Sequence, residues 1–153
     1  MTSPGRTDAH DHLAVFLGRW TAHGTSYGGT DQRGEDPKAN GEPWVSTHEA
    51  VWHTGKFFIV QDERADIAGS RFDTLSFLGV NDDGRFFSRS IENHGFYRDY
   101  KVTREGDRWH FEGATERATV TFENDGSRQR WKWEWKPENE WLPLCDRVAD
   151  KVD

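Results

Sequence analysis

The chain is 153 residues long, the size of one domain, and its 20 basic and 27 acidic residues give a formal charge of −7. That acidic balance argues against a nucleic-acid or anionic-membrane partner, because both would need a basic surface. Aromatic residues make up 14% of the chain, with eight Trp and ten Phe, which excludes a disordered chain. We therefore expect a folded domain in which a few large rings supply most of the buried surface.

Cys145 is the only cysteine, so the chain has no intrachain disulfide, and a reducing compartment fits. Residues 1–6 contain no apolar signal core. The longest apolar run is far too short to cross a bilayer. We expect a cytoplasmic protein, monomeric or homodimeric, with neither nucleic acid nor membrane as a partner.

The first periodic segment predicts a short helix over residues 10–17. Leu13, Phe16 and Leu17 recur there at helical spacing, and Gly18 ends the segment. Residues 1–9 are polar and small, which predicts a mobile tail before a domain over 10–153. His10 and His12 lie at the helix start, where we expect solvent-exposed side chains rather than a metal site, because no third ligand is near.

After Gly18 the pattern changes to a period of two, with tight-turn signals such as Asp83-Gly84 and Asp125-Gly126 between the segments. Ten strands are predicted, at residues 19–27, 44–53, 56–65, 71–80, 85–92, 95–104, 107–113, 117–124, 128–136 and 140–149. Ten short strands are too many for a flat sheet of this size. The sequence predicts an all-β fold, a single closed antiparallel up-and-down barrel of about ten strands after one short N-terminal helix.

The one long connection is the polar stretch from Gly28 to Pro43, which is rich in Gly and Asp. Two interpretations stay open at this point. The stretch is either a disordered excursion or a flap over the mouth of the barrel, and we favour the flap because long loops in compact domains often serve binding.

Several short motifs follow one another in an order that resembles a bacterial lipocalin-like (calycin) family of uncharacterised proteins, domain of unknown function 1579. They are Leu13–Trp20 (LAVFLGRW), the strand pair around Trp52–Val60, Leu78–Asp82, Asp125-Gly126 and Glu140–Asp146. The resemblance implies a barrel of the lipocalin or fatty-acid-binding-protein kind around one cavity. It also implies that Trp20 packs across the barrel floor beneath an arginine of the closing strand, with Arg147 as the candidate and Arg130 as the alternative.

The segment Leu17–Gly24 (LGRWTAHG) also resembles the opening of nitrobindin-type heme barrels. That resemblance implies heme as an alternative ligand. The residues themselves predict no cofactor and no metal site, because no His-Glu-x-x-His motif and no cysteine pair is present.

Trp131, Trp133 and Trp135 alternate with charged residues along one predicted strand. The charged face of a barrel strand lies outside, so we expect the three indoles to point inward. There they either fill the core at the closed end or form an aromatic wall for a planar or cationic ligand.

Polar residues with the inward phase are the other candidate ligand-binding residues. On one strand they are Gln61 and Glu63, and on another His94, Arg98 and Tyr100 share one face. An inward Arg98 needs a partner, expected to be Glu63, Glu92 or a ligand carboxylate, and is the preferred polar anchor.

We therefore predict a barrel that binds a small hydrophobic or aromatic molecule. The alternative is a barrel enzyme of the isomerase, cyclase or hydratase type, in which His94 with Glu63 or Glu92 supplies acid–base catalysis. A third class is a filled barrel that serves as a protein–protein module. Cys145 is expected to be a small buried residue rather than a nucleophile.

Overall fold

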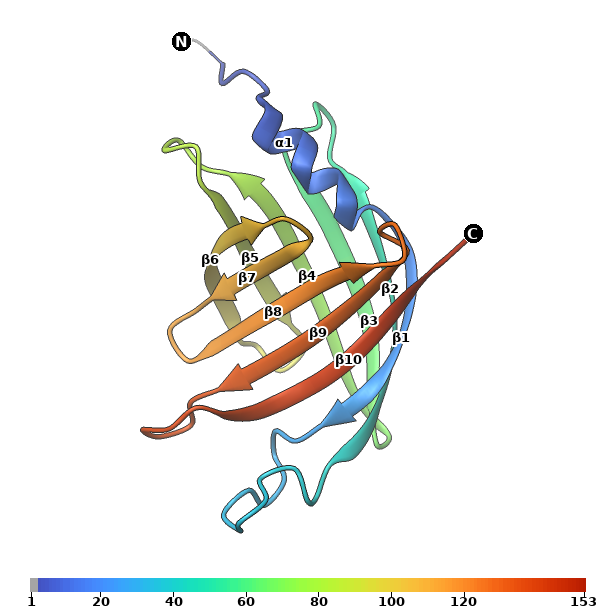
Figure 1. Cartoon of the computed structure of the whole chain (residues 1–153), viewed down its shortest axis with the longest axis vertical. Coiled ribbons are helices and arrows are strands. Elements are labelled where there is room, and N and C mark those ends of the chain that lie inside the picture. Colours follow the sequence, from blue (N-terminus) through green and yellow to red (C-terminus); the bar gives the residue numbers. More distant parts are fainter. Residues whose placement is uncertain (1–2) are drawn as a thin grey trace.

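The computed structural model describes residues 3–153 as one closed barrel in which consecutive strands pair antiparallel and β1 pairs with β10 (Figure 1). This confirms the predicted fold class. The strands are β1 (Gly18–Ser26), β2 (Glu42–Trp52), β3 (Ile59–Ile67), β4 (Ser70–Val80), β5 (Phe86–Glu92), β6 (Tyr97–Glu105), β7 (Arg108–Glu112), β8 (Glu116–Glu123), β9 (Arg128–Trp135) and β10 (Leu142–Val152).

The N-terminal helical segment begins earlier than predicted and has two parts, α1 (Asp8–His12) and the 3-10 helix η1 (Leu13–Phe16). Thr7 is the N-cap of α1, and its backbone N–H donates to Nδ1 of His10 over 3.0 Å. His10 is therefore buried, in contact with Phe57, and the expectation of a solvent-exposed His10 was wrong. Its imidazole completes the helix cap.

The third strand begins at Ile59, three residues later than predicted, because the preceding turn is longer than a two-residue hairpin. Gly55 and Lys56 both have positive φ, 92° and 60°. The N–H of His53 donates to the carbonyl of Phe58 over 2.8 Å and closes the turn. The chain reverses within these residues, so none of them is free to pair with β2.

The helical segment closes one end of the barrel (Figure 1). Phe16 is fully buried there, and its ring meets Trp109 and Phe122 edge-on at centroid distances of 5.0 and 5.1 Å. The indole N–H of Trp20 donates to the carbonyl of Phe16 over 3.2 Å. Leu13 completes this apolar plug, so side chains fill the floor of the barrel.

Trp20 packs across the floor as expected, but its cationic neighbour is Lys151 and neither predicted arginine. Trp20 and Lys151 are paired in the β1–β10 register, and the ammonium lies 5.6 Å from the ring centroid. Arg147 is paired with Gly24, four residues further along the strand, and therefore lies at another level. Arg130 points outward and pairs with Glu123 at 3.0 Å.

The long loop between β1 and β2 is folded against the end of the barrel opposite α1 (Figure 1). Gln32 donates to the carbonyl of Pro143 over 2.7 Å, and Lys38 forms an ion pair with Asp146 at 2.9 Å. Of the residues in this loop, only Gly28 and Gly29 line the cavity described below. The loop thus docks on the β9–β10 side of the rim, and it contributes only Gly28 and Gly29 to the lining of the cavity.

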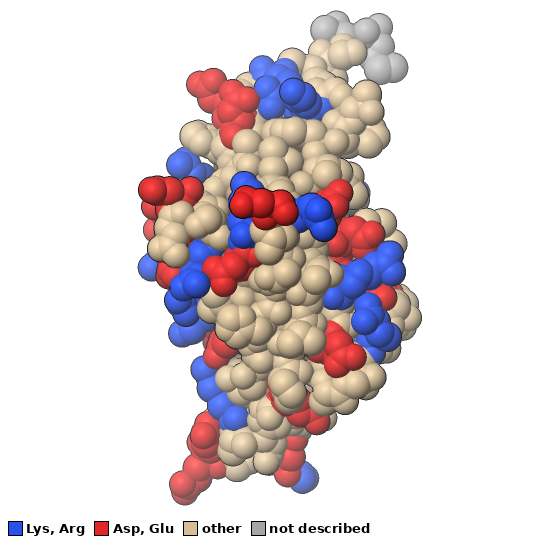
Figure 2. Space-filling model, turned by 90° about the vertical axis from the view of Figure 1, so that its right-hand side faces the viewer, with Lys and Arg blue, Asp and Glu red and all other residues tan. Residues whose placement is uncertain are grey.

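The outer wall carries mixed charge. On the face in Figure 2, basic and acidic side chains lie beside one another with uncharged surface between them. Outward ion pairs include Arg64–Asp62 at 3.1 Å and Arg89–Asp99 at 3.1 Å. Within residues 3–153, no helix is long and apolar enough to cross a membrane.

If the plug supports the barrel, Phe16→Ala should lower the free energy of unfolding by about 3–5 kcal/mol, because it leaves a cavity in the floor. Urea unfolding followed by Trp fluorescence measures this change. The matched control is Phe96→Ala, since Phe96 is 59% exposed; its effect should stay within about 0.5 kcal/mol. Equal effects of the two substitutions would contradict the assigned role of Phe16.

Candidate functional site

The barrel encloses a cavity of about 660 Å³ above the plug. This volume lies in the range of small-molecule sites. The cavity extends to the rim at the β3–β4 turn, where Ser70 and Arg71 line it, and at the start of the β1–β2 loop. All of the predicted ligand-binding residues line it, namely Gln61, Glu63, His94, Arg98, Tyr100, Trp131, Trp133 and Trp135.

The three tryptophans of β9 all line the cavity and form its aromatic wall. The rings of Trp131 and Trp133 are stacked, with centroids 5.8 Å apart and planes 8° from parallel. Trp131 donates its indole N–H to Gln129 over 2.9 Å, and Trp135 donates to Gln32 over 3.0 Å. These hydrogen bonds orient the rings of Trp131 and Trp135, whereas the indole N–H of Trp133 has no partner among the described residues and its ring is held by packing.

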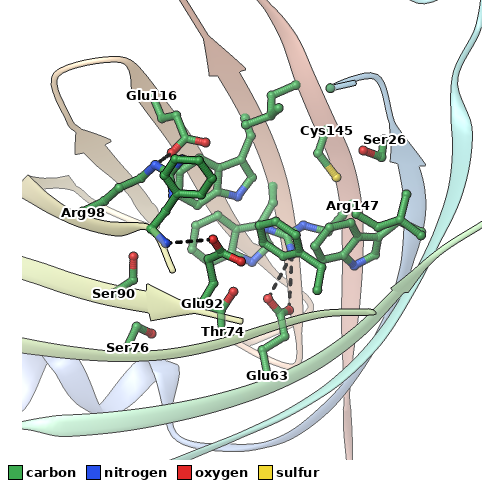
Figure 3. A pocket seen from close by; sticks show the side chains of 18 of the residues that line it. Ser26, Glu63, Thr74, Ser76, Ser90, Glu92, Arg98, Glu116, Cys145 and Arg147 are labelled. Carbon is green, nitrogen blue, oxygen red and sulfur yellow. Dashed lines mark hydrogen bonds and ion pairs between the residues drawn. The ribbon is translucent and has the colours of Figure 1, made fainter. Parts of the chain in front are cut away.

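Arg147 and Glu63 form an ion pair across the cavity from β10 to β3 (Figure 3). Nη1 of Arg147 donates to both carboxylate oxygens of Glu63 over 3.2 Å. The guanidinium lies 4.3 Å from the ring centroid of Trp44, and Ser46 donates to Glu63 over 3.2 Å. Stacking and pairing together compensate two largely buried charges.

His48 lies beside this pair, with its ring stacked on Trp20 at 5.9 Å and 12°. Its Nδ1 is 3.9 Å from Glu63, and neither ring nitrogen has a hydrogen-bond partner among the described residues. Burial lowers the pKa of His48; Glu63 opposes that shift and Arg147 adds to it. The imidazole is therefore neutral at pH 7.

Arg98 points inward as predicted, but its partner is Glu116 of β8 rather than Glu63 or Glu92 (Figure 3). The Tyr100 hydroxyl donates to the same carboxylate over 3.3 Å. Burial raises the pKa of Glu116, and Arg98 opposes that rise. Burial and the Glu116 charge also raise the pKa of Tyr100, so its phenol stays protonated.

Glu92 and His94 meet at the mouth. The Glu92 side chain is only 4% exposed, and its Oε2 lies 2.6 Å from Nδ1 of His94. Burial alone would raise the pKa of Glu92, but hydrogen bonds from the backbone and ring of His94 and from the backbone of Phe96 bring it below its ordinary value. His94 is 48% exposed, so a fixed carboxylate orients an accessible imidazole.

Cys145 is buried beside Trp44 and Ala65, as expected for a small apolar residue. Burial raises the pKa of its thiol to about 11, so at neutral pH it is not a thiolate.

Sequence reasoning missed three residues of this site: His48, Glu116 and, as a cavity residue, Arg147. A signal for each was present in the strand alternation. His48 has the inward phase of Trp44, and Glu116 has the phase of Ala118 and Val120.

No protein-family model matches the chain, and no curated protein sequence matches it. Among solved structures it is similar to the S-type phycobiliprotein lyase CPES from Guillardia theta, with a TM-score of 0.59 and 9% identity over 97% of this chain and 94% of that one. The likeness shows the barrel fold alone. The narrower resemblance to domain of unknown function 1579 has no family match behind it.

Breaking the inner ion pair should be costly. Arg147→Met leaves Glu63 buried without its partner, and we expect a loss of about 3–5 kcal/mol in the free energy of unfolding. Adding Glu63→Gln to that variant should recover most of the loss, since no charge then remains. The control is Arg64→Met at an exposed pair, which should cost less than about 1 kcal/mol. If Arg147→Met lowers the free energy of unfolding no more than Arg64→Met does, the buried ion pair does not have this role.

His48 should make the protein less stable in acid. Its folded-state pKa lies below its ordinary value of 6.5, so below that pH the unfolded chain binds a proton that the folded chain does not. The free energy of unfolding should therefore fall as pH drops from 7 to 5, and His48→Phe should make the fall shallower. Chemical denaturation at each pH measures the free energy of unfolding. The control is His53→Phe, at an exposed histidine. Identical slopes in wild type and His48→Phe would refute the prediction.

Proposed function

We propose that this protein binds a planar aromatic small molecule inside the barrel. The observation that carries the proposal is the stacked pair Trp131–Trp133, which presents flat indole surface to a cavity of about 660 Å³. Aromatic rings prefer offset or stacked contact with such surfaces, and preorganised rings lose little entropy on binding. The likeness to a phycobiliprotein lyase supports the barrel on which this function rests.

Quenching of Trp fluorescence by a panel of planar aromatic compounds, flavone among them, tests the proposal. At least one compound should quench saturably, and Trp133→Leu should weaken its binding about tenfold or more because half of the stacked pair is lost. The control is Trp141→Leu; this indole stacks on Arg117 at 4.1 Å and does not line the cavity. If no compound quenches saturably, or if Trp141→Leu is as harmful, the proposal fails.

Catalysis on the bound molecule is a second candidate function, favoured by the Glu92–His94 pair. Glu92 holds Nδ1 of His94, which leaves Nε2 of an accessible imidazole to take a proton from a ligand at the mouth. Proton abstraction next to a carbonyl group is the simplest reaction that such a pair supports, and it is the first step of many isomerisations.

Deuterium incorporation from D₂O into carbonyl compounds, followed by NMR, tests this candidate. His94→Gln should lower the exchange rate about 10²-fold or more while it leaves binding of the same compound unchanged. Glu92→Gln should give an intermediate rate, because the imidazole loses its orienting partner. An exchange rate that is the same in wild type and His94→Gln would remove His94 from any mechanism.

Heme stays a further candidate, and His48 is the residue that supports it. Its imidazole is neutral and without a hydrogen-bond partner, which is the form that ligates iron, and heme would supply an iron centre for redox or gas-ligand chemistry. Titration with hemin should then give a shifted Soret band that His48→Phe abolishes and His94→Gln leaves in place. A Soret spectrum equal to that of free hemin rejects this candidate.

A further inference from the structure

A second wall of the cavity carries polar groups, and it lies across from the tryptophans. Along the closed ring of strands, β4 is separated from β9 by the same number of strands in both directions. The inward side chains of β4 therefore face the Trp wall. The inward side chains of β3 and β5 flank those of β4. These three strands together therefore form the wall of the cavity opposite the tryptophans.

These strands present a strip of uncharged polar side chains. Gln61, Ser76 and Ser90 follow one another in register across β3, β4 and β5. Thr74 lies one pair nearer the mouth and Ser88 one pair deeper, and all five line the cavity. Figure 3 shows Thr74, Ser76 and Ser90 together on strands away from Arg147 and Cys145. We call these five residues, four with a hydroxyl and Gln61 with an amide, the hydroxyl strip.

The strip has unused hydrogen-bonding capacity. Among the described residues, the side chains of Gln61, Thr74, Ser76 and Ser88 make none of the side-chain hydrogen bonds that fix the remainder of the site. Ser88 is only 4% exposed. Ser88 is the buried member of the strip and the other four are half-buried, so all five can exchange hydrogen bonds with a ligand in the cavity.

The charged groups of the cavity argue against an anionic ligand. Arg147 is paired with Glu63 and Arg98 with Glu116. Each guanidinium charge is already balanced by a glutamate, so a ligand carboxylate would add an unbalanced negative charge to the cavity. Both inward arginines are thus already paired with glutamates, which leaves hydrogen bonding rather than charge for recognition of the ligand.

We propose that the ligand is an uncharged, planar aromatic molecule with hydroxyl groups along one edge, of the polyphenol class. This inference rests on the proposed function and names the ligand chemistry for it. The rings stack on Trp131 and Trp133, while the hydroxyl edge exchanges hydrogen bonds with the hydroxyl strip. Each phenolic hydroxyl both donates and accepts, as do the serine and threonine hydroxyls opposite it.

Three matched probes test the ligand class at pH 6, where phenols stay protonated: flavone, 4′,7-dihydroxyflavone and flavone-6-carboxylate. Quenching of Trp fluorescence gives the dissociation constant of each. The dihydroxy compound should bind about tenfold more tightly than flavone, because it gains hydrogen bonds to groups that otherwise lack them. The carboxylate should bind more weakly than flavone.

A double variant locates the effect. Ser76→Ala with Ser88→Ala should remove most of the tenfold advantage of 4′,7-dihydroxyflavone while flavone binding changes less than twofold. The control is Thr47→Ala, which removes an exposed hydroxyl from the outer face of β2. Thermal unfolding of each variant shows whether the barrel remains intact, and Ser76→Ala alone serves if the double variant is unstable.

The outcomes separate this inference from the function on which it rests. If flavone itself does not bind, the proposed function fails. If flavone binds but the dihydroxy compound gains nothing, or if the double variant weakens both probes equally, only the hydroxyl inference is overturned. Tighter binding of the carboxylate than of flavone would also overturn it, since the cavity would then favour an anion.

Discussion

Pairing of β1 with β10 is the interaction on which the interior depends. Residues Arg19–Ser26 pair with residues Cys145–Val152 and close the ring, so no strand edge is left without a partner. Closure also gives each strand one inner and one outer face. Since side chains alternate, a slip of one residue in this pairing would turn Arg147 outward and an acidic neighbour inward. The composition of the cavity is therefore fixed by backbone hydrogen bonds.

Within this frame the cavity is layered from the floor to the mouth. The plug around Phe16 and Trp20 is apolar, the Arg147–Glu63 pair lies level with Trp131 and Thr74 above it, and Glu92 with His94 lies at the mouth. Besides Glu42 at the rim, three glutamates line the cavity, and each has a basic neighbour: Glu63 with Arg147, Glu92 with His94 and Glu116 with Arg98. Buried pairs of this kind add little net stability over apolar residues of the same volume, but removal of one partner is costly.

Strand alternation and turn chemistry predicted most of the fold and the direction of the main side chains. Trp131, Trp133 and Trp135 line the cavity because a period of two admits only one inward face. Alternation does not specify how far along the barrel axis a residue lies. The expected contact of Trp20 with Arg147 failed for this reason, since the register places Lys151 beside Trp20 instead.

The partner of Arg98 was missed for a related reason, which lies in the length of one strand. β7 ends at Glu112, and its last pair with β6 is Lys101–Glu112. Arg98 lies beyond that end, so its side chain meets Glu116 of β8 with no strand between them. A difference of a few residues in the length of β7 is below what a hydrophobic pattern specifies.

Trp135 belongs to two parts of the molecule at once, since its ring lines the cavity and its N–H is held by Gln32 of the β1–β2 loop. Gln32 also donates to the backbone of β10 through Pro143. A ligand that turns the Trp135 indole breaks its hydrogen bond to Gln32 and so loosens the loop. A partner bound to the loop in turn changes how the ligand fits in the cavity. Ligand binding in the cavity and the conformation of the rim are thus thermodynamically coupled through the side chain of Gln32.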